Sequence, residues 1–360
     1  YGDTFEKGSV AVSDGRRHRM KARNSLAIAM SIICVFGTIA LSQTPCPVGA
    51  DERVWVGNAI AAWTKVRKDS LGLPSAKLPW LLLFNETCVI HIEPDPKSLP
   101  HDPLLVRPKR SRFGRITVRA WIAPHSGKIT LPDGGEVPLG LLSFAAPYDN
   151  GKASFLISAL PAVWRKAPHL QSEPNVDVLA ASVFVHEMTH TLHSGFYDQL
   201  SEIEKRKKTP DEIDDDIIQK RFEKVEDFRA MIESERKLLY EAASQSGRAE
   251  KRRLAAMALE AIDQRRHRFF AGETAEFAEI EDVFLTMEGV ANWAAFKAAL
   301  DQGLPRPEAL KLIRRGGKYW SQDIGLALFL VIDDMLPSWQ KRAFAPRNAT
   351  AYELLRDAVK

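Results

Sequence analysis

Residues 185–190 read Val-His-Glu-Met-Thr-His and contain the pattern His-Glu-x-x-His. In an α-helix, residues four apart lie one turn apart on the same face, so His186 and His190 can bind one metal ion. Glu187 lies beside that face and can take a proton from a water molecule as a general base. The pattern therefore predicts one Zn²⁺ per chain and a centre that activates water.

The surroundings of this pattern favour a metal site over a pair of surface histidines. With ordinary composition, the pattern is expected by chance roughly 0.016 times in a chain of this length. Residues 178–185 are apolar and compatible with a helix, which Asn175 or Asp177 can cap and Gly195 can end. We therefore expect the two histidines on a buried helix.

A third protein ligand must come from elsewhere, because catalytic zinc usually has three. His193 is close in sequence and could line the site, but a third ligand on the same helix would crowd a tetrahedral centre. Glu288 stands in an apolar helical run, where an unpaired carboxylate would be costly, and Gly289 beside it allows close approach of another backbone. Glu288 is therefore the predicted third ligand.

Two further observations bear on this ligand. Asn292, four residues after Glu288, shares its face and could accept the free ring N–H of His186 or His190. The alternative for Glu288 is a core carboxylate in a salt bridge. Rival acidic ligands stand in a more polar stretch upstream: Glu273, Glu276, Glu279 and Glu281.

His-Glu-x-x-His followed by a distant Glu-Gly-x-Ala, at residues 288–291, resembles the gluzincin-type zinc metallopeptidases. The resemblance covers roughly residues 140–335 and implies a zincin-like fold with Glu288 as the third zinc ligand. The metzincin pattern does not fit, because Phe196 stands where that class has its third histidine. The gap of 98 residues from His190 to Glu288 is long, and the charged segment 201–270 accounts for most of it.

The resemblance also implies a hydroxyl donor for the oxyanion and an edge strand that binds the peptide. Tyr319 is the first choice for the donor, followed by Tyr197 and His193, and the alternative for Tyr319 is a buried aromatic side chain. Residues 141–146 are a candidate for the edge strand, since peptide substrates can add to an exposed sheet edge.

The order of predicted elements favours an α+β fold, with strands first and helices afterwards. A helix is expected at 51–70, and the pattern becomes helical from about residue 177. Strands are predicted at 79–92 with a turn at 85–86, 115–123, 136–144 and 153–163. Four segments follow from this order: 1–50, 51–198 with the His-Glu-x-x-His helix, a charged helical insertion at 199–270, and a helical part with the third-ligand helix at 271–360.

The insertion is distinguished by its charge. Residues 201–240 hold 12 acidic and 10 basic side chains, with a thin apolar stripe. This predicts one long solvated helix that forms a hairpin with residues 251–270 near 244–247. It is either a surface insertion packed on one side or a partner-binding surface or lid at 201–265.

The amino-terminal segment predicts export. Residues 25–42 carry no charge and follow a basic stretch, which is typical of a signal peptide or a membrane anchor. Small residues at 48–50 offer a cleavage site. Both readings place residues 51–360 outside the cytoplasm, and membrane contact is expected only through 25–42 if this segment stays uncleaved.

Composition narrows the function further. The net charge is +4, of which +3 lies in residues 1–50, so no nucleic-acid partner is expected. Of three cysteines, only Cys46 and Cys88 could form a structural disulfide, in an oxidising compartment. The prediction is an exported zinc metallopeptidase acting on a peptide or protein. The alternatives are an envelope binding or scaffold protein with a degenerate site, and a zinc hydrolase of another kind.

Overall fold

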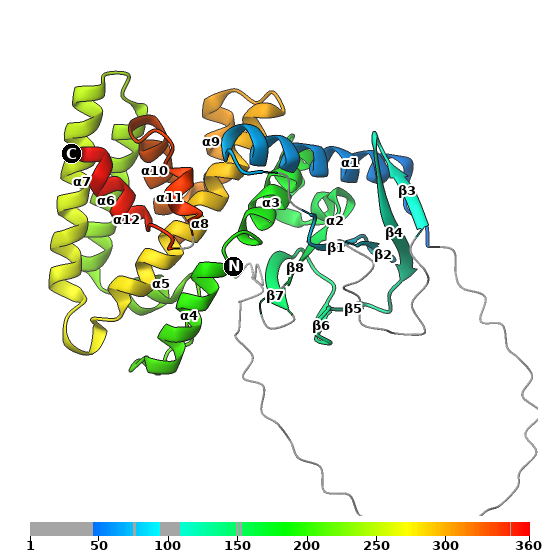
Figure 1. The fold of residues 1–360 in the computed structure, drawn as a ribbon, viewed down its shortest axis with the longest axis horizontal. Helices are drawn as coiled ribbons and strands as arrows, with labels where there is room; N and C mark the ends of the chain where they lie inside the picture. The colour runs from blue at the N-terminus through cyan, green and yellow to red at the C-terminus, as the bar shows by residue number, and fades with distance from the viewer. Residues whose placement is uncertain (1–45, 75–76, 94–108, 149–150, 152, 346) are drawn as a thin grey trace, which may run out of the picture.

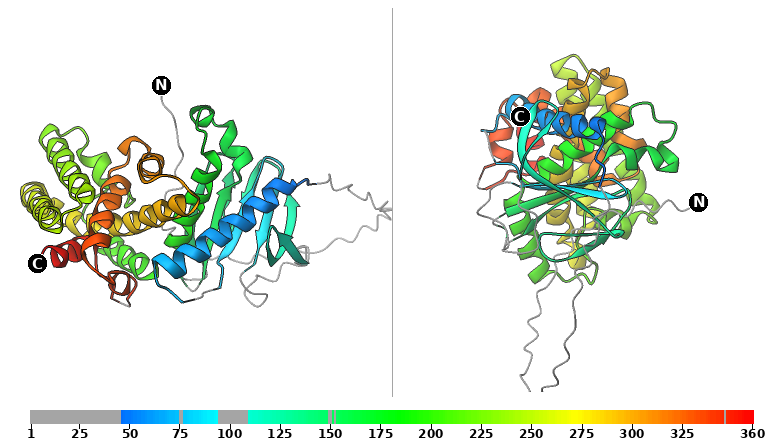
Figure 2. Two further views of the ribbon diagram at one scale, coloured as in Figure 1. Left: turned by 90° about the horizontal axis from the view of Figure 1, so that it is seen from above. Right: turned by 90° about the vertical axis from the view of Figure 1, so that its right-hand side faces the viewer.

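A mixed β-sheet and a group of helices make up the two halves of the computed structural model (Figure 1). It describes residues 46–360 except 75–76, 94–108, 149–150, 152 and 346. The first helix, α1 (Ala50–Lys65), continues into a π-helical turn (Val66–Ser70), as predicted for 51–70. It lies against the sheet and the His-Glu-x-x-His helix through Val56, Ile60 and other buried side chains (Figure 2).

The sheet has six strands in the order β3-β4-β2-β1-β8-β7. Neighbours are antiparallel except β1 and β8, which are parallel, so the sheet is mixed. The strands are β1 (Trp80–Phe84), β2 (Cys88–Ile92), β3 (Lys109–Phe113), β4 (Ile116–Pro124), β7 (Ser143–Tyr148) and β8 (Ala153–Ala159). Two short strands, β5 (Lys128–Thr130) and β6 (Glu136–Pro138), form a separate pair.

Two strand predictions were wrong in their extent. The strand predicted at 136–144 is divided into β6 and β7, because Pro138 and Gly140 interrupt it. The strand predicted at 153–163 ends at Ala159, because Pro161 opens a short helix, α2 (Pro161–Lys166). Proline cannot donate a ladder hydrogen bond, so strands tend to stop where it occurs.

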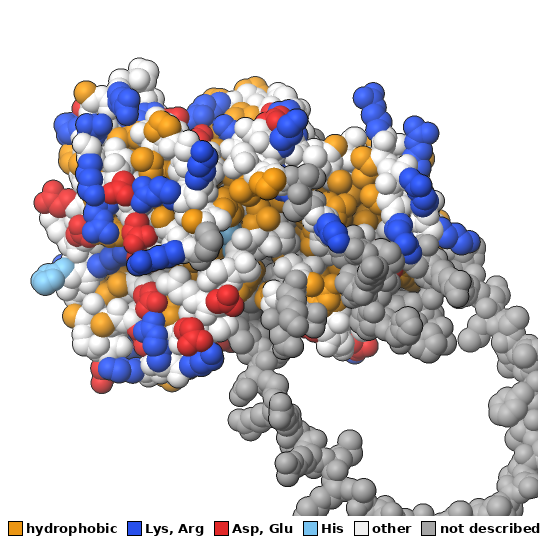
Figure 3. Space-filling view, viewed as in Figure 1, with side chains coloured by type: hydrophobic (Ala, Val, Ile, Leu, Met, Phe, Trp, Pro, Cys, Tyr) orange, Lys and Arg blue, Asp and Glu red, His pale blue; other side chains and the backbone are white. Residues whose placement is uncertain are grey.

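The two edges of the six-stranded sheet differ in charge. On β3, the side chains of Lys109, Arg110 and Arg112 are exposed, and Figure 3 shows basic side chains gathered over β3 and β4. Charged edges resist pairing with another strand. On the opposite edge, β7 has no charged residue and packs against the helix that carries His186. The uncharged edge of the sheet is therefore the one beside the candidate site.

Three helices form the centre of the molecule: α3 (Val176–His190), α8 (Phe277–Asp301) and α10 (Trp320–Met335). The helix α8 packs against both α3 and α10. A Cβ at Gly289 would lie 2.6 Å from the carbonyl oxygen of Gly325, so α8 and α10 touch backbone to backbone. The remaining short elements are α9 (Arg306–Arg314), α11 (Gln340–Ala343), α12 (Ala351–Val359) and 3₁₀ turns at Pro168–Leu170, Gly272–Thr274 and Arg315–Gly317.

The charged insertion is not the single solvated helix predicted for 201–240. It comprises α4 (Ser194–Arg206), α5 (Ile217–Phe222), α6 (Glu226–Ser244) and α7 (Arg248–Phe269). The helix α4 ends at Arg206, and Pro210 and an acidic loop follow it. The predicted hairpin near 244–247 is confirmed, because α6 and α7 are joined there and pack against each other. In addition, α6 packs on α10, and its Glu235 forms a buried ion pair with Arg265 (Oε1–Nε 2.7 Å).

The amino-terminal end of the described chain is joined to the sheet by a disulfide between Cys46 and Cys88, as the cysteine count allowed. The apolar segment 25–42 lies outside the described residues. Within the described residues, no helix has the length and apolar character needed to cross a membrane.

Candidate metal centre

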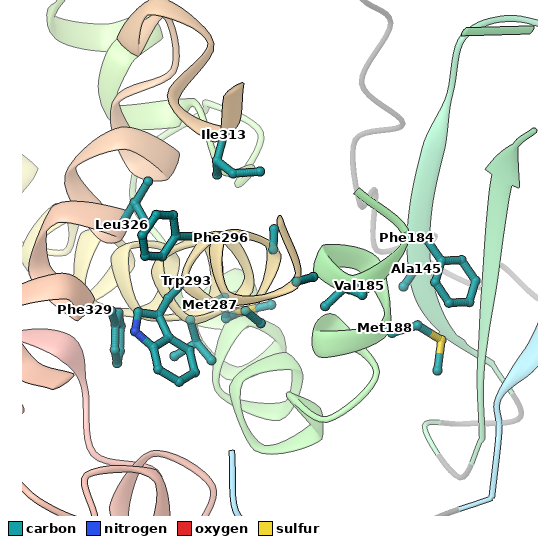
Figure 4. Packing of buried hydrophobic residues seen from close by; sticks show 14 of the residues in the cluster. Ala145, Phe184, Val185, Met188, Met287, Trp293, Phe296, Ile313, Leu326 and Phe329 are labelled. Carbon is teal, nitrogen blue, oxygen red and sulfur yellow. The ribbon is translucent and has the colours of Figure 1, made fainter. Parts of the chain in front are cut away.

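The helix α3 brings two histidines together in a buried place. Its sequence is apolar on most sides, and Figure 4 shows Phe184 and Met188 directed toward the sheet near Ala145 of β7. The remaining face carries His186 and His190, both buried, with their Nε2 atoms 2.9 Å apart. The helix ends at His190, earlier than the predicted stop at Gly195, which lies in α4.

Glu288 of α8 completes the group. Its Oε2 lies 3.4 Å from His186 Nε2, and its Oε1 lies 3.3 Å from His190 Nε2. The structure thus brings the three predicted ligands together, although they are separated by 98 residues. The approach depends on the packing of α8 between α3 and α10, where Gly289 keeps the helices close.

This arrangement of donors fits a bound cation. Two ring nitrogens face each other and only one can donate a hydrogen bond to the other, while Glu288 Oε2 has no hydrogen-bond partner among the described residues. Burial would raise the pKa of the Glu288 carboxyl, but His190 and His186 hold it well below its usual range. A charged carboxylate with two imidazole nitrogens is a donor set that suits Zn²⁺.

Glu187 lies beside these ligands. One ligand atom each from His186, Glu187 and His190 lies within 4.8 Å of the others. Burial raises the pKa of Glu187, although both histidines act against this, and its carboxylate accepts a hydrogen bond from the backbone of Ala145. A carboxylate with a raised pKa is a stronger base, which is what the predicted general base requires.

Asn292 contacts the first of the two histidines. Its Oδ1 lies 3.2 Å from His186 Nδ1, while its Nδ2 donates to the carbonyl oxygen of Gln322 at 3.3 Å. Because the amide donates to Gln322, its oxygen is the end that faces His186 and accepts the Nδ1–H. This leaves His186 Nε2 unprotonated and available to a metal ion.

His193 takes the corresponding place beside the second histidine. Its Nδ1 lies 3.4 Å from His190 Nδ1, and its ring stacks on Phe344 with centroids 5.8 Å apart. Burial, together with the charge of His190, lowers the pKa of His193 well below its usual value. The ring nitrogen of a neutral His193 can therefore accept a hydrogen bond from His190 Nδ1–H. His193 thus contacts His190, one of the predicted ligands, and is not itself a predicted ligand.

The two candidate hydroxyl donors lie in different places. Burial raises the pKa of Tyr197 on α4, and the charges of Glu187 and Glu288 add to this effect, so its phenol is close to both carboxylates. Tyr319 precedes α10, with Lys318 Nζ 5.3 Å from its ring centroid. It acts on Arg315. Of the two, Tyr197 is the one on which the charges of Glu187 and Glu288 act.

The rival glutamates are engaged elsewhere. Glu281 pairs with Arg265 and Arg266, each N–O distance being 2.8 Å. Glu279 pairs with Arg206. Glu276 accepts hydrogen bonds from backbone N–H groups at residues 208 and 209, and Glu273 lies in an exposed 3₁₀ turn. Among the predicted acids, Glu288 is thus the one that contacts both histidines.

Sequence reasoning missed two charged residues near the centre. The carboxylate of Asp215, in the loop before α5, acts on the pKa of His190. Arg315, between α9 and α10, is influenced by the charge of Glu187. The available signal for Arg315 was the sequence Arg-Gly-Gly just before Tyr319, whereas the acidic run at 214–216 gave no reason to select Asp215.

Comparison of the chain with protein-family models, curated proteins and solved structures finds no match. The chemistry of the centre is therefore inferred from its donor set, its burial and the contacts of its ligands.

Proposed function

We propose that this protein is an exported zinc-dependent metallopeptidase with a gluzincin-type centre. The observation that carries the proposal is the convergence of His186, His190 and Glu288, with Glu187 buried beside them. These three ligands would hold one Zn²⁺, and the mixed β-sheet beside α3 supports the proposal of a zincin-like fold.

The residues of this chain divide the chemistry among them. A bound zinc ion would polarise the scissile carbonyl and lower the pKa of a water molecule toward ~7. Glu187 takes the proton from the attacking water and returns it to the leaving amine. A tyrosine hydroxyl would donate to the oxyanion, either Tyr319, the first choice from the sequence, or Tyr197, whose pKa responds to the charges of Glu187 and Glu288. Asn292 and His193 hold the imidazole rings in orientation.

The position of β7 supports a peptide as the substrate. It is the edge strand that packs against α3, and the backbone of Ala145 on it acts to lower the pKa of Glu187. A peptide that added to this edge would therefore run past the general base, and the residues predicted for this role, 141–146, overlap β7.

The disulfide between Cys46 and Cys88 supports export, because such bonds persist in oxidising compartments. Cleavage after Ala50, at the small residues of the predicted site, would remove Cys46. We therefore propose either an uncleaved anchor at 25–42 or processing upstream of Cys46.

Zinc content and peptide hydrolysis of the full chain test the proposal together. We expect near one zinc per chain in the wild type, weaker binding in His186→Ala and Glu288→Ala, and retained zinc with almost no hydrolysis in Glu187→Gln. The matched control is Glu273→Gln, in an exposed turn, which should behave as wild type. Absence of zinc after reconstitution, or comparable hydrolysis by Glu187→Gln, would overturn the mechanism.

If the protein were instead an envelope binding or scaffold protein, its charged insertion would be an exposed surface that binds a partner. The packing of α6 on α10 and the buried pair between Glu235 and Arg265 give this segment a structural role instead. No described feature of the molecule favours a hydrolase that acts on other bonds, and substrate tests separate that class.

A further inference from the structure

A β-hairpin at one edge of the sheet carries cations and no acid. It comprises β3 and β4, residues 109–124, and we call it the basic hairpin. Its sequence contains no Asp or Glu and five cations, all of them exposed: Lys109, Arg110, Arg112, Arg115 and Arg119. Figure 3 shows basic side chains gathered over these two strands. The whole chain is nearly balanced, with 50 basic and 46 acidic residues, so this segment differs from the rest in carrying one sign of charge.

Three of these arginines lie on one face of the basic hairpin. Arg110 of β3 is directly opposite Arg119 of β4. Two residues along β3, Arg112 is opposite Thr117. Directly opposed residues of antiparallel strands share a face, with Cβ atoms about 5 Å apart, and like charges at such positions destabilise the pairing. The position of Arg110 opposite Arg119 therefore favours a surface that is completed by an anion.

The described part of the chain supplies little negative charge to this face. Glu93 Oε2 lies 3.8 Å from Arg119 Nε, yet the side chain of Arg119 is 44% exposed. Arg112 donates through Nε to the carbonyl oxygen of Gly114 at 3.0 Å. Among the described residues, Arg110 has no ion-pair partner. These guanidinium groups can therefore bind an anion with several oxygens, such as a phosphate.

Protection of the sheet edge accounts for only part of this charge. Charged side chains on an edge strand prevent it from pairing with another chain, and β3 is an edge strand. Arg119, however, lies on β4, the second strand of the sheet. Its charge is not needed at the edge, and it opposes Arg110 at a cost in stability. A binding surface accounts for both residues.

The first helix connects this surface to the beginning of the described chain. Cys46 is bonded to Cys88, and α1 begins four residues after Cys46, at Ala50. A Cβ at Gly57 of α1 would lie 2.3 Å from the carbonyl oxygen of Phe113 at the end of β3. The seven residues of helix between these points span about 11 Å. The basic hairpin is thus within about two helical turns of the start of α1 (Figure 1).

The sequence before Cys46 favours a membrane as the partner. The candidate anchor at 25–42 ends four residues earlier, and four residues of extended chain reach at most about 14 Å. If 25–42 lies in a bilayer, this short tether keeps the basic hairpin within reach of the lipid headgroups. Val54 of α1 is 47% exposed, and a Cβ at Gly114 in the hairpin turn would lie 3.4 Å from its carbonyl oxygen. Cations beside an exposed apolar side chain suit the interface of an anionic membrane.

We propose that the basic hairpin binds the surface of a membrane that contains acidic phospholipids. The guanidinium groups of Arg110, Arg112 and Arg119 bind the lipid phosphates, and Val54 enters the interface beside them. The candidate anchor favours this surface over an acidic protein or a soluble polyanion. The inference goes beyond the proposed peptidase activity and does not depend on it.

Energy transfer from a dye on the basic hairpin to labelled lipid headgroups tests the proposal with the full chain. The dye is attached to Thr117→Cys, an exposed position on the arginine face, and Cys34→Ser removes the cysteine outside the disulfide. We expect more transfer in phosphatidylcholine vesicles that contain about 30% phosphatidylglycerol than in phosphatidylcholine alone. The difference should disappear in about 1 M NaCl, where the Debye length is about 3 Å.

Removal of two charges should weaken this docking. Each cation near an acidic membrane changes binding by roughly fivefold, so in Arg110→Gln with Arg112→Gln the ratio of docked to undocked hairpin should fall about 10-fold or more. Arg110→Lys with Arg112→Lys keeps the charge and should retain most of the difference between the vesicles. Lys224→Gln with Arg229→Gln removes two exposed cations from the insertion and should behave as the labelled wild type.

Two results would overturn the proposal: equal transfer in both kinds of vesicle, or a difference that persists in Arg110→Gln with Arg112→Gln. Fluorescence polarisation with soluble polyglutamate and with heparin measures the other partners. Binding of either polymer together with equal transfer in both vesicles would assign the face to a soluble polyanion. Zinc content and hydrolysis are measured separately, so the proposed function stands or fails independently of this test.

Discussion

Asn292 shows how one amide can determine which nitrogen of a ligand is available. Its Nδ2 donates to the carbonyl oxygen of Gln322, so its Oδ1 must face His186 Nδ1. The proton is then held on Nδ1, and Nε2 is left to the metal. Under the proposed function, Asn292 would therefore influence the metal affinity of the centre without touching metal or substrate.

Replacing this amide should weaken zinc binding. Loss of such an outer partner typically costs 10–100-fold in metal affinity, and we expect a fall of about this size in Asn292→Ala. Competition with a chelator measures it. Asn292→Asp keeps an acceptor and should stay near wild type, while Gln302→Ala at the end of the same helix is a control. Equal zinc affinity in Asn292→Ala and wild type would contradict the role.

His91 predicts a loss of stability in acid. Burial lowers its pKa to about 4, from about 6.5 in the unfolded chain, and its ring stacks on Trp121 with centroids 4.3 Å apart. The folded state therefore disfavours the proton, so its stability falls as pH decreases from about 6.5 toward 4, by at most about 3 kcal/mol.

Urea unfolding at pH 7.5 and pH 5, with EDTA present to exclude metal release, measures this loss. His91→Phe should lose less stability than wild type between the two pH values, whereas His267→Gln, an exposed histidine, should not differ from wild type. The same pH dependence in His91→Phe and wild type would assign the loss to other groups.

At the scale of helices, the sequence predicts which residues share a helix face, but it does not predict the contacts between distant segments. The spacing of His186 and His190 fixes their common face, and the cost of an unpaired carboxylate singles out Glu288 in its apolar run. Local reasoning could therefore select the three residues that the structure brings together. The turn after α9 depends on left-handed backbone at residues 315–317 and on distant partners, because Arg236 bonds to Gly317 and Gln219 bonds to Lys318, which no local pattern encodes. The predicted charged helix was wrong because charge periodicity does not reveal the break at Pro210.

The contact between α8 and α10 should be sensitive to a single methyl group. Gly289→Ala places a Cβ 2.6 Å from the carbonyl oxygen of Gly325, and overpacking of this kind costs about 1–3 kcal/mol. We also expect weaker zinc binding, since Glu288 is adjacent. Thermal unfolding and zinc titration measure the two effects. Gly247→Ala, which meets no atom within 4 Å, is the control. Unchanged stability and zinc affinity would show that the helices adjust freely.

At the scale of the whole molecule, the disulfide ties the amino-terminal end of the described chain to the sheet. Cys46 and Cys88 are 42 residues apart, and closing a loop of that length stabilises the folded state by about 4 kcal/mol in the chain-entropy model. We expect Cys46→Ser with Cys88→Ser to lower the free energy of unfolding by an amount of this order. Denaturant unfolding measures it, and reduction of wild type should give the same shift. Equal stability of oxidised and reduced protein would mean that the bond does not support the fold.

The division of ligands between α3 and α8 has a consequence for the order in which the protein is made. The two histidines and the general base are synthesised about a hundred residues before Glu288, and the turn that carries Arg315 comes later still. Under the proposed function, a partly exported chain would have the general base and two of the zinc ligands but not the third. Under the proposed function, such a chain could not hydrolyse its neighbours or itself, and hydrolysis would begin only when the helical half had folded against the first.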